Sequence, residues 1–78
     1  MPYIKSIQPK ADYTLKILFE NGHTVILDMN QKIETTRFRQ LLDQTLFLGA
    51  TTDGSSIRWS DLIEISAEEI FEIAKHSR

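Results

Sequence analysis

The segment that leads up to Asn21-Gly22 constrains the fold more than any other part of the sequence. Its apolar side chains recur at every second residue, at Tyr13, Leu15, Ile17 and Phe19. This period of two is typical of a β-strand with one buried face, because successive side chains of a strand point to opposite faces. Asn-Gly is a strong short signal for the turn between two antiparallel strands. The sequence therefore predicts a β-hairpin over residues 13–29.

Two registers of this hairpin are conceivable, and the burial of its side chains distinguishes them. A two-residue loop would place Asp28 opposite Leu15, on the apolar face. A three-residue loop, Glu20-Asn21-Gly22 with Gly22 left-handed in a bulge, makes that face almost wholly apolar. Its facing pairs are Phe19 with His23, Ile17 with Val25, Leu15 with Leu27 and Tyr13 with Met29. We expect the bulged register, since a one-residue slip would move every side chain to the other face.

Weaker patterns on either side of the hairpin predict a strand and a helix. A short strand near Ile4 ends at Pro9, because proline has no amide hydrogen to donate to a neighbouring strand. After the hairpin, an amphipathic helix is expected, with Thr35 or Thr36 as its N-cap. The i, i+3, i+4 spacing that predicts this helix is formed by Phe38, Leu41 and Leu42.

A second turn signal, Asp53-Gly54, predicts a second hairpin. A two-residue loop at this position would place Ala50 opposite Ile57 and Leu48 opposite Trp59. The apolar faces of the two strands then match without a bulge.

A capping-box motif at Ser66 marks the start of the last helix, after a short extended segment at residues 62–65. In this motif Ser66 and Glu69 can each satisfy the other's backbone N–H. Together the elements predict a single small α+β domain over residues 1–78, in the order β-β-β-α-β-β-α. We expect an antiparallel sheet of about five strands, two hairpins plus the N-terminal strand, with two helices packed on one face.

Composition narrows the class of protein. Seventy-eight residues suffice for one small domain, and without cysteine the chain can form neither a disulfide nor a thiolate nucleophile. The formal net charge of −2 disfavours a non-specific phosphate-backbone binder, because such proteins need surplus lysine and arginine. Apolar runs are too short for a signal sequence or a membrane span, so we expect a cytoplasmic protein with no membrane partner.

Residues suited to catalysis or metal binding are few and scattered. His23 and His76 are the only histidines, and neither belongs to a cluster with the spacing of metal ligands. Asp53 with Ser55 and Ser56 is typical of a turn, since no base is near enough in sequence to activate a serine. We therefore predict no catalytic, metal-binding or cofactor-binding residues, no cofactor and no small-molecule ligand.

A set of short motifs extends over nearly the whole chain. They are Ile4-Lys5-Ser6-Ile7, Pro9, Tyr13, Phe19-Glu20-Asn21-Gly22, Leu27-Asp28-Met29, Phe38 with Leu41, Leu46-Phe47, Asp53-Gly54, Ile57 with Trp59, and Ser66 with Glu69. In this order they resemble a family of small bacterial proteins, the domain-of-unknown-function family 2442 (DUF2442). The resemblance implies an antiparallel sheet with two helices and no agreed function. It also implies partners in two-gene, toxin–antitoxin-like arrangements and, in some longer relatives, a helix-turn-helix.

Four residues are candidates for contact with a partner: Trp59, Arg37, Arg39 and Arg58. Aromatic residues are frequent in binding hot spots, although the alternation of Trp59 with Ile57 favours a core position. Our hypothesis is a non-catalytic protein-interaction module, the antitoxin-like half of a two-gene pair. A protein partner or a second copy would dock at a sheet edge near residues 3–7 or 46–51.

Two other classes of function remain open at this point. In a transcription-regulatory, nucleic-acid-binding protein, Lys16, Arg37, Arg39 and Arg58 would converge on one face after folding. The acidic balance of the chain disfavours this class. A small hydrolase or nuclease fits the sequence least, because it would need His23 close to an acidic residue in a cleft.

Overall fold

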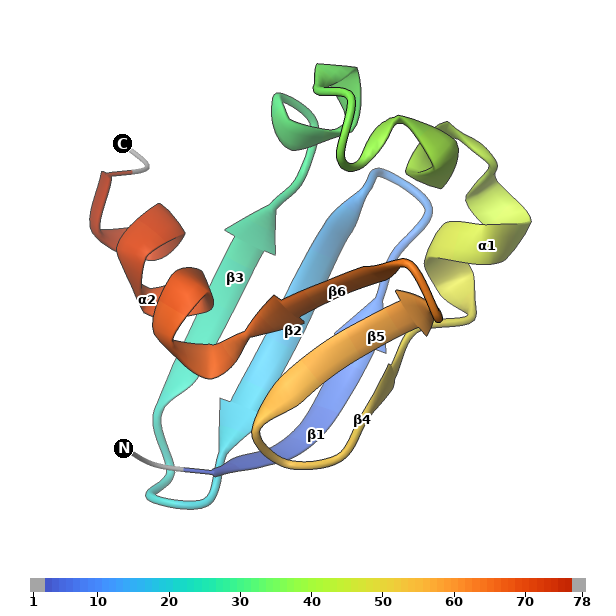
Figure 1. Ribbon diagram of the computed structural model, residues 1–78. Coiled ribbons are helices and arrows are strands. Elements are labelled where there is room, and N and C mark those ends of the chain that lie inside the picture. The colour runs from blue at the N-terminus through green and yellow to red at the C-terminus, as the bar shows by residue number, and fades with distance from the viewer. Residues whose placement is uncertain (1–2, 77–78) are drawn as a thin grey trace.

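The computed structural model describes residues 3–76, which form two antiparallel sheets of three strands each (Figure 1). The first sheet has the order β1-β2-β3, with β1 at Ile4–Pro9, β2 at Thr14–Phe19 and β3 at Thr24–Asp28. The second has the order β4-β5-β6, with β4 at Thr51–Thr52, β5 at Ser56–Ser60 and β6 at Ile63–Ser66. The α+β class is therefore confirmed, but the single sheet of about five strands is wrong.

The helical segments lie between the two sheets in sequence and after the last strand. Two 3-10 turns, Lys32–Glu34 and Arg39–Leu42, and the short helix α1 (Gln44–Leu48) join the two sheets. The helix α2 (Ala67–His76) follows β6 directly and packs against β6 and β3. No helix within residues 3–76 is long and apolar enough to cross a membrane.

The first hairpin has the predicted bulged register. Leu15 faces Leu27 and Ile17 faces Val25, while the Phe19 N–H donates to the carbonyl oxygen of His23 over 2.8 Å. Gly22 has a φ of +90°, a left-handed conformation that glycine adopts without steric strain. The choice of register by burial is confirmed, because Asp28 stays on the exposed face.

The predicted register of the second hairpin is wrong. Thr52 faces Ile57, so four residues separate this facing pair, and Leu48 belongs to α1 instead of facing Trp59. The cause is the side chain of Asp53. Its Oδ1 accepts hydrogen bonds of 3.0 Å from the backbone N–H groups of Ser55 and Ser56, which follow it by two and three residues. This folds a wider turn than Asp-Gly predicts.

The helix predicted around Phe38 and Leu42 is also wrong in its bounds. Leu42 lies in a 3-10 turn that begins after Phe38, and the α-helix begins only after Asp43, whose Oδ1 accepts a 3.0 Å bond from the N–H of Thr45. Asp43 is the N-cap, and the expected caps Thr35 and Thr36 are not. Phe38 is buried as predicted, whereas Leu42 is exposed.

One apolar core joins both sheets and the connection between them. Its buried members within the described residues include no polar or charged residue. Phe47 of α1 packs edge-on against Tyr13, with ring centroids 5.2 Å apart, and stacks on Trp59 of β5. At the other end of the core, Phe71 of α2 stacks on Phe19 of β2 at 4.9 Å. The expectation that two helices cover one face of one sheet is therefore wrong, because each helix links the two sheets.

Candidate protein-interaction surface

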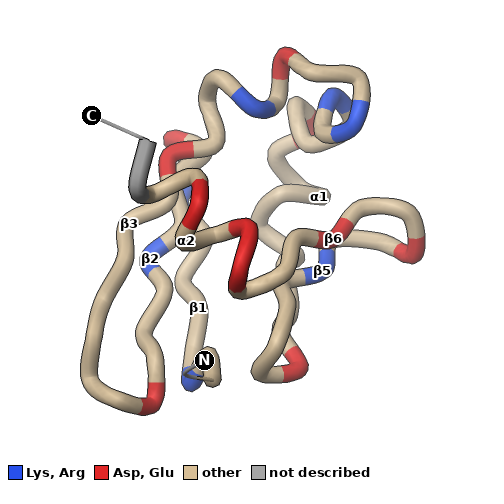
Figure 2. Tube along the Cα trace, turned by 60° about the vertical axis from the view of Figure 1, so that its left-hand side comes forward, with Lys and Arg blue, Asp and Glu red and all other residues tan. Residues whose placement is uncertain are grey.

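A groove of about 650 Å³ crosses the surface where β5 begins, β6 ends and α2 starts. It is lined by Tyr3, Arg37, Ser55, Ser56, Glu64, Ser66, Ala67, Glu68 and Glu69. We call it the acidic groove, since three glutamates and a single arginine supply its charges. Figure 2 shows acidic positions along α2, which starts at the groove. Tyr3 is 60% exposed and adds an aromatic ring to this polar surface.

Arg37 forms hydrogen bonds with β6 and with α2, which both border the groove. Its guanidinium makes two contacts with the carboxylate of Glu69, one through Nη1 and one from Nη2 to Oε1 at 3.0 Å. Nη2 also donates to the backbone carbonyl of Glu64 at 2.7 Å, and the guanidinium carbon lies 4.6 Å from the ring centre of Phe38. Hydrogen bonding to the Glu69 carboxylate raises the pKa of Arg37 above its ordinary value. The connection between the sheets is thereby joined to the first turn of α2.

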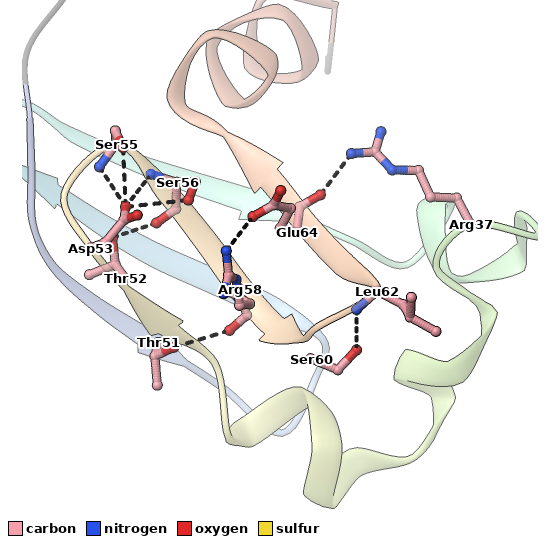
Figure 3. A network of polar contacts seen from close by, with 10 residues as sticks. All are labelled: Arg37, Thr51, Thr52, Asp53, Ser55, Ser56, Arg58, Ser60, Leu62 and Glu64. Carbon is pink, nitrogen blue, oxygen red and sulfur yellow. Dashed lines mark hydrogen bonds and ion pairs between the residues drawn. The ribbon is translucent and has the colours of Figure 1, made fainter.

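Arg58 contacts Glu64, whose carbonyl Arg37 binds, from the other side. It faces Glu64 directly across the β5–β6 ladder, and its Nη2 lies 3.1 Å from Glu64 Oε2. Figure 3 shows Glu64 between the two arginines, with its side chain toward Arg58 and its carbonyl toward Arg37. Both partners of the Arg58 pair are about half exposed, so the pair contributes little to stability. The structure therefore brings two of the four candidate residues, Arg37 and Arg58, together around Glu64, and each of them pairs with a glutamate carboxylate.

The other two candidates lie apart from this network. Arg39 is exposed on the 3-10 turn that precedes α1. Trp59 is only 6% exposed and packs between Phe47 and Phe38, at ring distances of 6.1 and 6.3 Å. This is the core position that its alternation with Ile57 predicts. The Trp59 Nε1 is buried and has no hydrogen-bond partner among the described residues.

The residues weighed for catalysis have turn and surface positions. Asp53 accepts hydrogen bonds from the N–H and hydroxyl groups of Ser55 and Ser56. The bond from the Ser55 N–H, and after it the bond from the Ser56 N–H, lower the pKa of the Asp53 carboxyl. His23 is exposed at the mouth of the first hairpin and does not line the groove. The side chain of His76 lies outside the described residues. Among the side chains that the structure describes, no group of three or more His, Asp or Glu residues is placed to hold a metal ion.

Sequence reasoning missed Tyr3, Glu64 and Glu68 as neighbours in one groove. Arg37 and Glu69 are 32 residues apart in the chain, and no local pattern indicates that they meet. A signal did exist for Glu64, because it alternates with the buried Ile63 and Ile65 and must face outward from β6.

The comparison with known protein families gives one result. The model of a family described as a protein of unknown function, DUF2442, matches residues 4–76, nearly the whole chain. No match to the chain was found among curated proteins or among solved structures.

Proposed function

The chain belongs to the DUF2442 family, and from that premise we propose that it is a non-catalytic protein-interaction module that binds a basic protein through the acidic groove. The observation that carries this proposal is the composition of the groove, in which Glu64, Glu68 and Glu69 outnumber Arg37. A surface with an excess of one charge speeds and orients the approach of a partner of the opposite charge.

The charges of the groove differ in how far they are already satisfied. Glu69 is paired with Arg37, and Glu64 with Arg58. Glu68 is exposed on the first turn of α2. A lysine or arginine of the partner can therefore reach Glu68 without breaking an ion pair of the chain. Tyr3, beside these carboxylates, offers the kind of ring on which an arginine side chain stacks.

The groove is lined mainly by polar side chains. Within the described residues the interior holds only apolar side chains, and three serines of the groove lie at turns or at the start of α2. Ser66 uses its hydroxyl oxygen to accept the Glu69 N–H at 3.1 Å. The hydroxyl oxygen of Ser66 is thus already engaged by the helix, which favours a role of the groove in binding over a role in a reaction. We further propose that the partner is encoded beside this chain, as the antitoxin-like half of a two-gene pair would require.

Co-expression with the neighbouring gene product tests the proposal. We expect one peak for both proteins in size-exclusion chromatography, and a dissociation constant that rises with salt, because exposed charges are screened. Glu68→Lys should weaken the complex at least about tenfold, a loss of about 1.4 kcal/mol. The matched control is Asp61→Lys, which makes the same charge change at an exposed residue of the β5–β6 turn that does not line the groove. Two separate peaks at micromolar concentration, or equal effects of both variants, would contradict the proposal.

A further inference from the structure

Three of the four sheet edges within residues 3–76 are obstructed. The β1 edge carries a bulge between Ile4 and Ser6, ends in Pro9, and gives its Ile4 N–H to the carbonyl of Gly54 at 2.8 Å. The β4 edge is only two residues long. On β6 the Glu64 carbonyl already accepts a bond from Arg37, on the side away from β5 (Figure 3). Bulges, prolines and covering side chains are the usual means of keeping other strands away from an edge.

The fourth edge, β3, lacks these features. Its five residues pair with β2 without a register shift and contain neither proline nor lysine. Ile26, at the middle of the strand, is 60% exposed. The helix α2 packs against β3, but its Phe71 stacks on the fully buried Phe19, so this contact is on the core side of the sheet.

The hydrogen-bonding pattern determines which backbone groups this edge presents. Tyr13 accepts from Met29, and Phe19 donates to His23, so every second residue between these positions points its N–H and C=O toward β2. On β3 the residues whose backbone groups point toward β2 include Val25 and Leu27, which face Ile17 and Leu15. Thr24, Ile26 and Asp28 therefore direct their backbone groups away from the sheet, toward the open edge.

We propose that β3 pairs antiparallel with β3 of a second copy of the chain, across a twofold axis at Ile26, to form one continuous six-stranded sheet. In this register Ile26 faces Ile26 of the second copy, and Thr24 faces Asp28. About six backbone hydrogen bonds join the two strands, two for each facing pair of residues.

The edge is self-complementary, which is why a second copy is the occupant. The central pair is apolar, and Lys16 of β2, which faces Ile26 on the same surface, can lay its aliphatic stem beside it. Each outer pair sets a carboxylate against a threonine hydroxyl that can donate to it, so no like charges oppose each other. The basic partner proposed for the acidic groove has no matching acidic row on β3, because Asp28 is the only carboxylate there. This inference is therefore independent of the proposed function.

The association should be weak, since the contact is one strand long and small interfaces belong to transient complexes. We expect a monomer–dimer equilibrium in sedimentation velocity, with a dissociation constant between about 10 μM and about 1 mM. Ile26→Lys should raise the dissociation constant at least about tenfold, because it opposes two like charges at the axis. The matched control is Leu62→Lys, which adds the same charge at a side chain that is 86% exposed in the β5–β6 turn and should leave the equilibrium unchanged.

Amide hydrogen exchange in the wild-type chain gives a second measurement that needs no variant. As concentration rises, the protection of the backbone amides should increase at Thr24, Ile26 and Asp28. It should not change at Val25 or Leu27, which already bond to β2. Glu68→Lys, which targets the groove, should dimerise like wild type. A chain that stays monomeric throughout this range, a dimer that Ile26→Lys does not weaken, or unchanged exchange at Ile26 would each overturn the proposal.

Discussion

Phe47 and Leu48 are adjacent in α1, and their replacement by alanine tests how the connection packs against the second sheet. Phe47 is fully buried between Tyr13 and Trp59, whereas Leu48 is 44% exposed. Both substitutions place alanine in the same five-residue helix, so the effects of helix propensity are small and similar. The hairpin that Asp53-Gly54 predicts from sequence would instead place Leu48 opposite Trp59 on the buried face. The two arrangements therefore predict opposite orders of stability for the two variants.

The magnitudes follow from burial. Replacing a fully buried phenylalanine by alanine removes its transfer free energy and leaves a cavity, at a cost of about 3–5 kcal/mol. Leu48→Ala should cost less than about 1 kcal/mol, because the side chain is partly in water already. At about 0.05–0.15 kcal/mol per residue, a domain of this length has a free energy of unfolding of about 4–12 kcal/mol. Phe47→Ala thus removes a large share of the stability and should lower the midpoint of thermal unfolding by about 12 °C or more.

Urea unfolding measures both changes. Trp59 is the single tryptophan, and since it stacks on Phe47 its fluorescence reports on this part of the core. Far-UV circular dichroism provides a second probe, because the loss of Phe47 also alters the tryptophan's surroundings. Phe47→Leu, with a smaller loss, serves if the alanine variant does not fold. Equal losses for Phe47→Ala and Leu48→Ala, or a larger loss for Leu48→Ala, would refute the packing described for α1.

Three smaller perturbations test individual contacts. Gly22→Ala should cost about 1–2 kcal/mol because φ is +90° there, whereas Gly49→Ala, at an ordinary φ of −85°, should change stability by less than about 1 kcal/mol; similar losses in thermal unfolding would contradict this. A double-mutant cycle of Arg37→Gln and Glu69→Gln should give a coupling below about 1 kcal/mol that falls with salt, since both side chains are partly exposed; a salt-independent coupling would be unexpected. The pKa of the Asp53 carboxyl should lie below 3.8 in an NMR titration. Because folding lowers this pKa, its stabilising effect is present above the unfolded value and is lost as pH falls through the folded one. Asp53→Asn should remove that dependence, and a folded pKa at or above 3.8 would be inconsistent with the turn.

The elements that the sequence predicts well are those specified by short-range chemistry. The first hairpin follows from a period of two, a glycine for the left-handed position and the exclusion of Asp28 from the buried face. The start of α2 follows from Ser66, whose hydroxyl oxygen accepts the Glu69 N–H as predicted. In both cases the competing local conformations bury a charge or leave a backbone donor unpaired, so the neighbouring residues alone decide the outcome.

The connection between the sheets could not be predicted in this way. The i, i+3, i+4 spacing of Phe38, Leu41 and Leu42 fits an α-helix, but Asp43 caps a new helix immediately afterwards and ends the first as a 3-10 turn. Phe47 then enters the core instead of Leu42. The decision depends on Tyr13 and the second sheet, which lie far away in sequence, and spacing within a short window contains no information about them.

Two of the failures of local reasoning lie at the acidic groove. The capping box predicts that the Glu69 carboxylate folds back on its own helix, yet it extends to Arg37, while Ser66 alone caps the helix. The Asp-Gly signal predicts a tight turn, yet the wider turn directs Ser55 and Ser56 into the groove. Sequences depart from their local preferences mainly where a binding or reactive surface competes with stability. Two independent departures that meet on one surface therefore support, separately from its charge, the proposal that the chain binds its partner there.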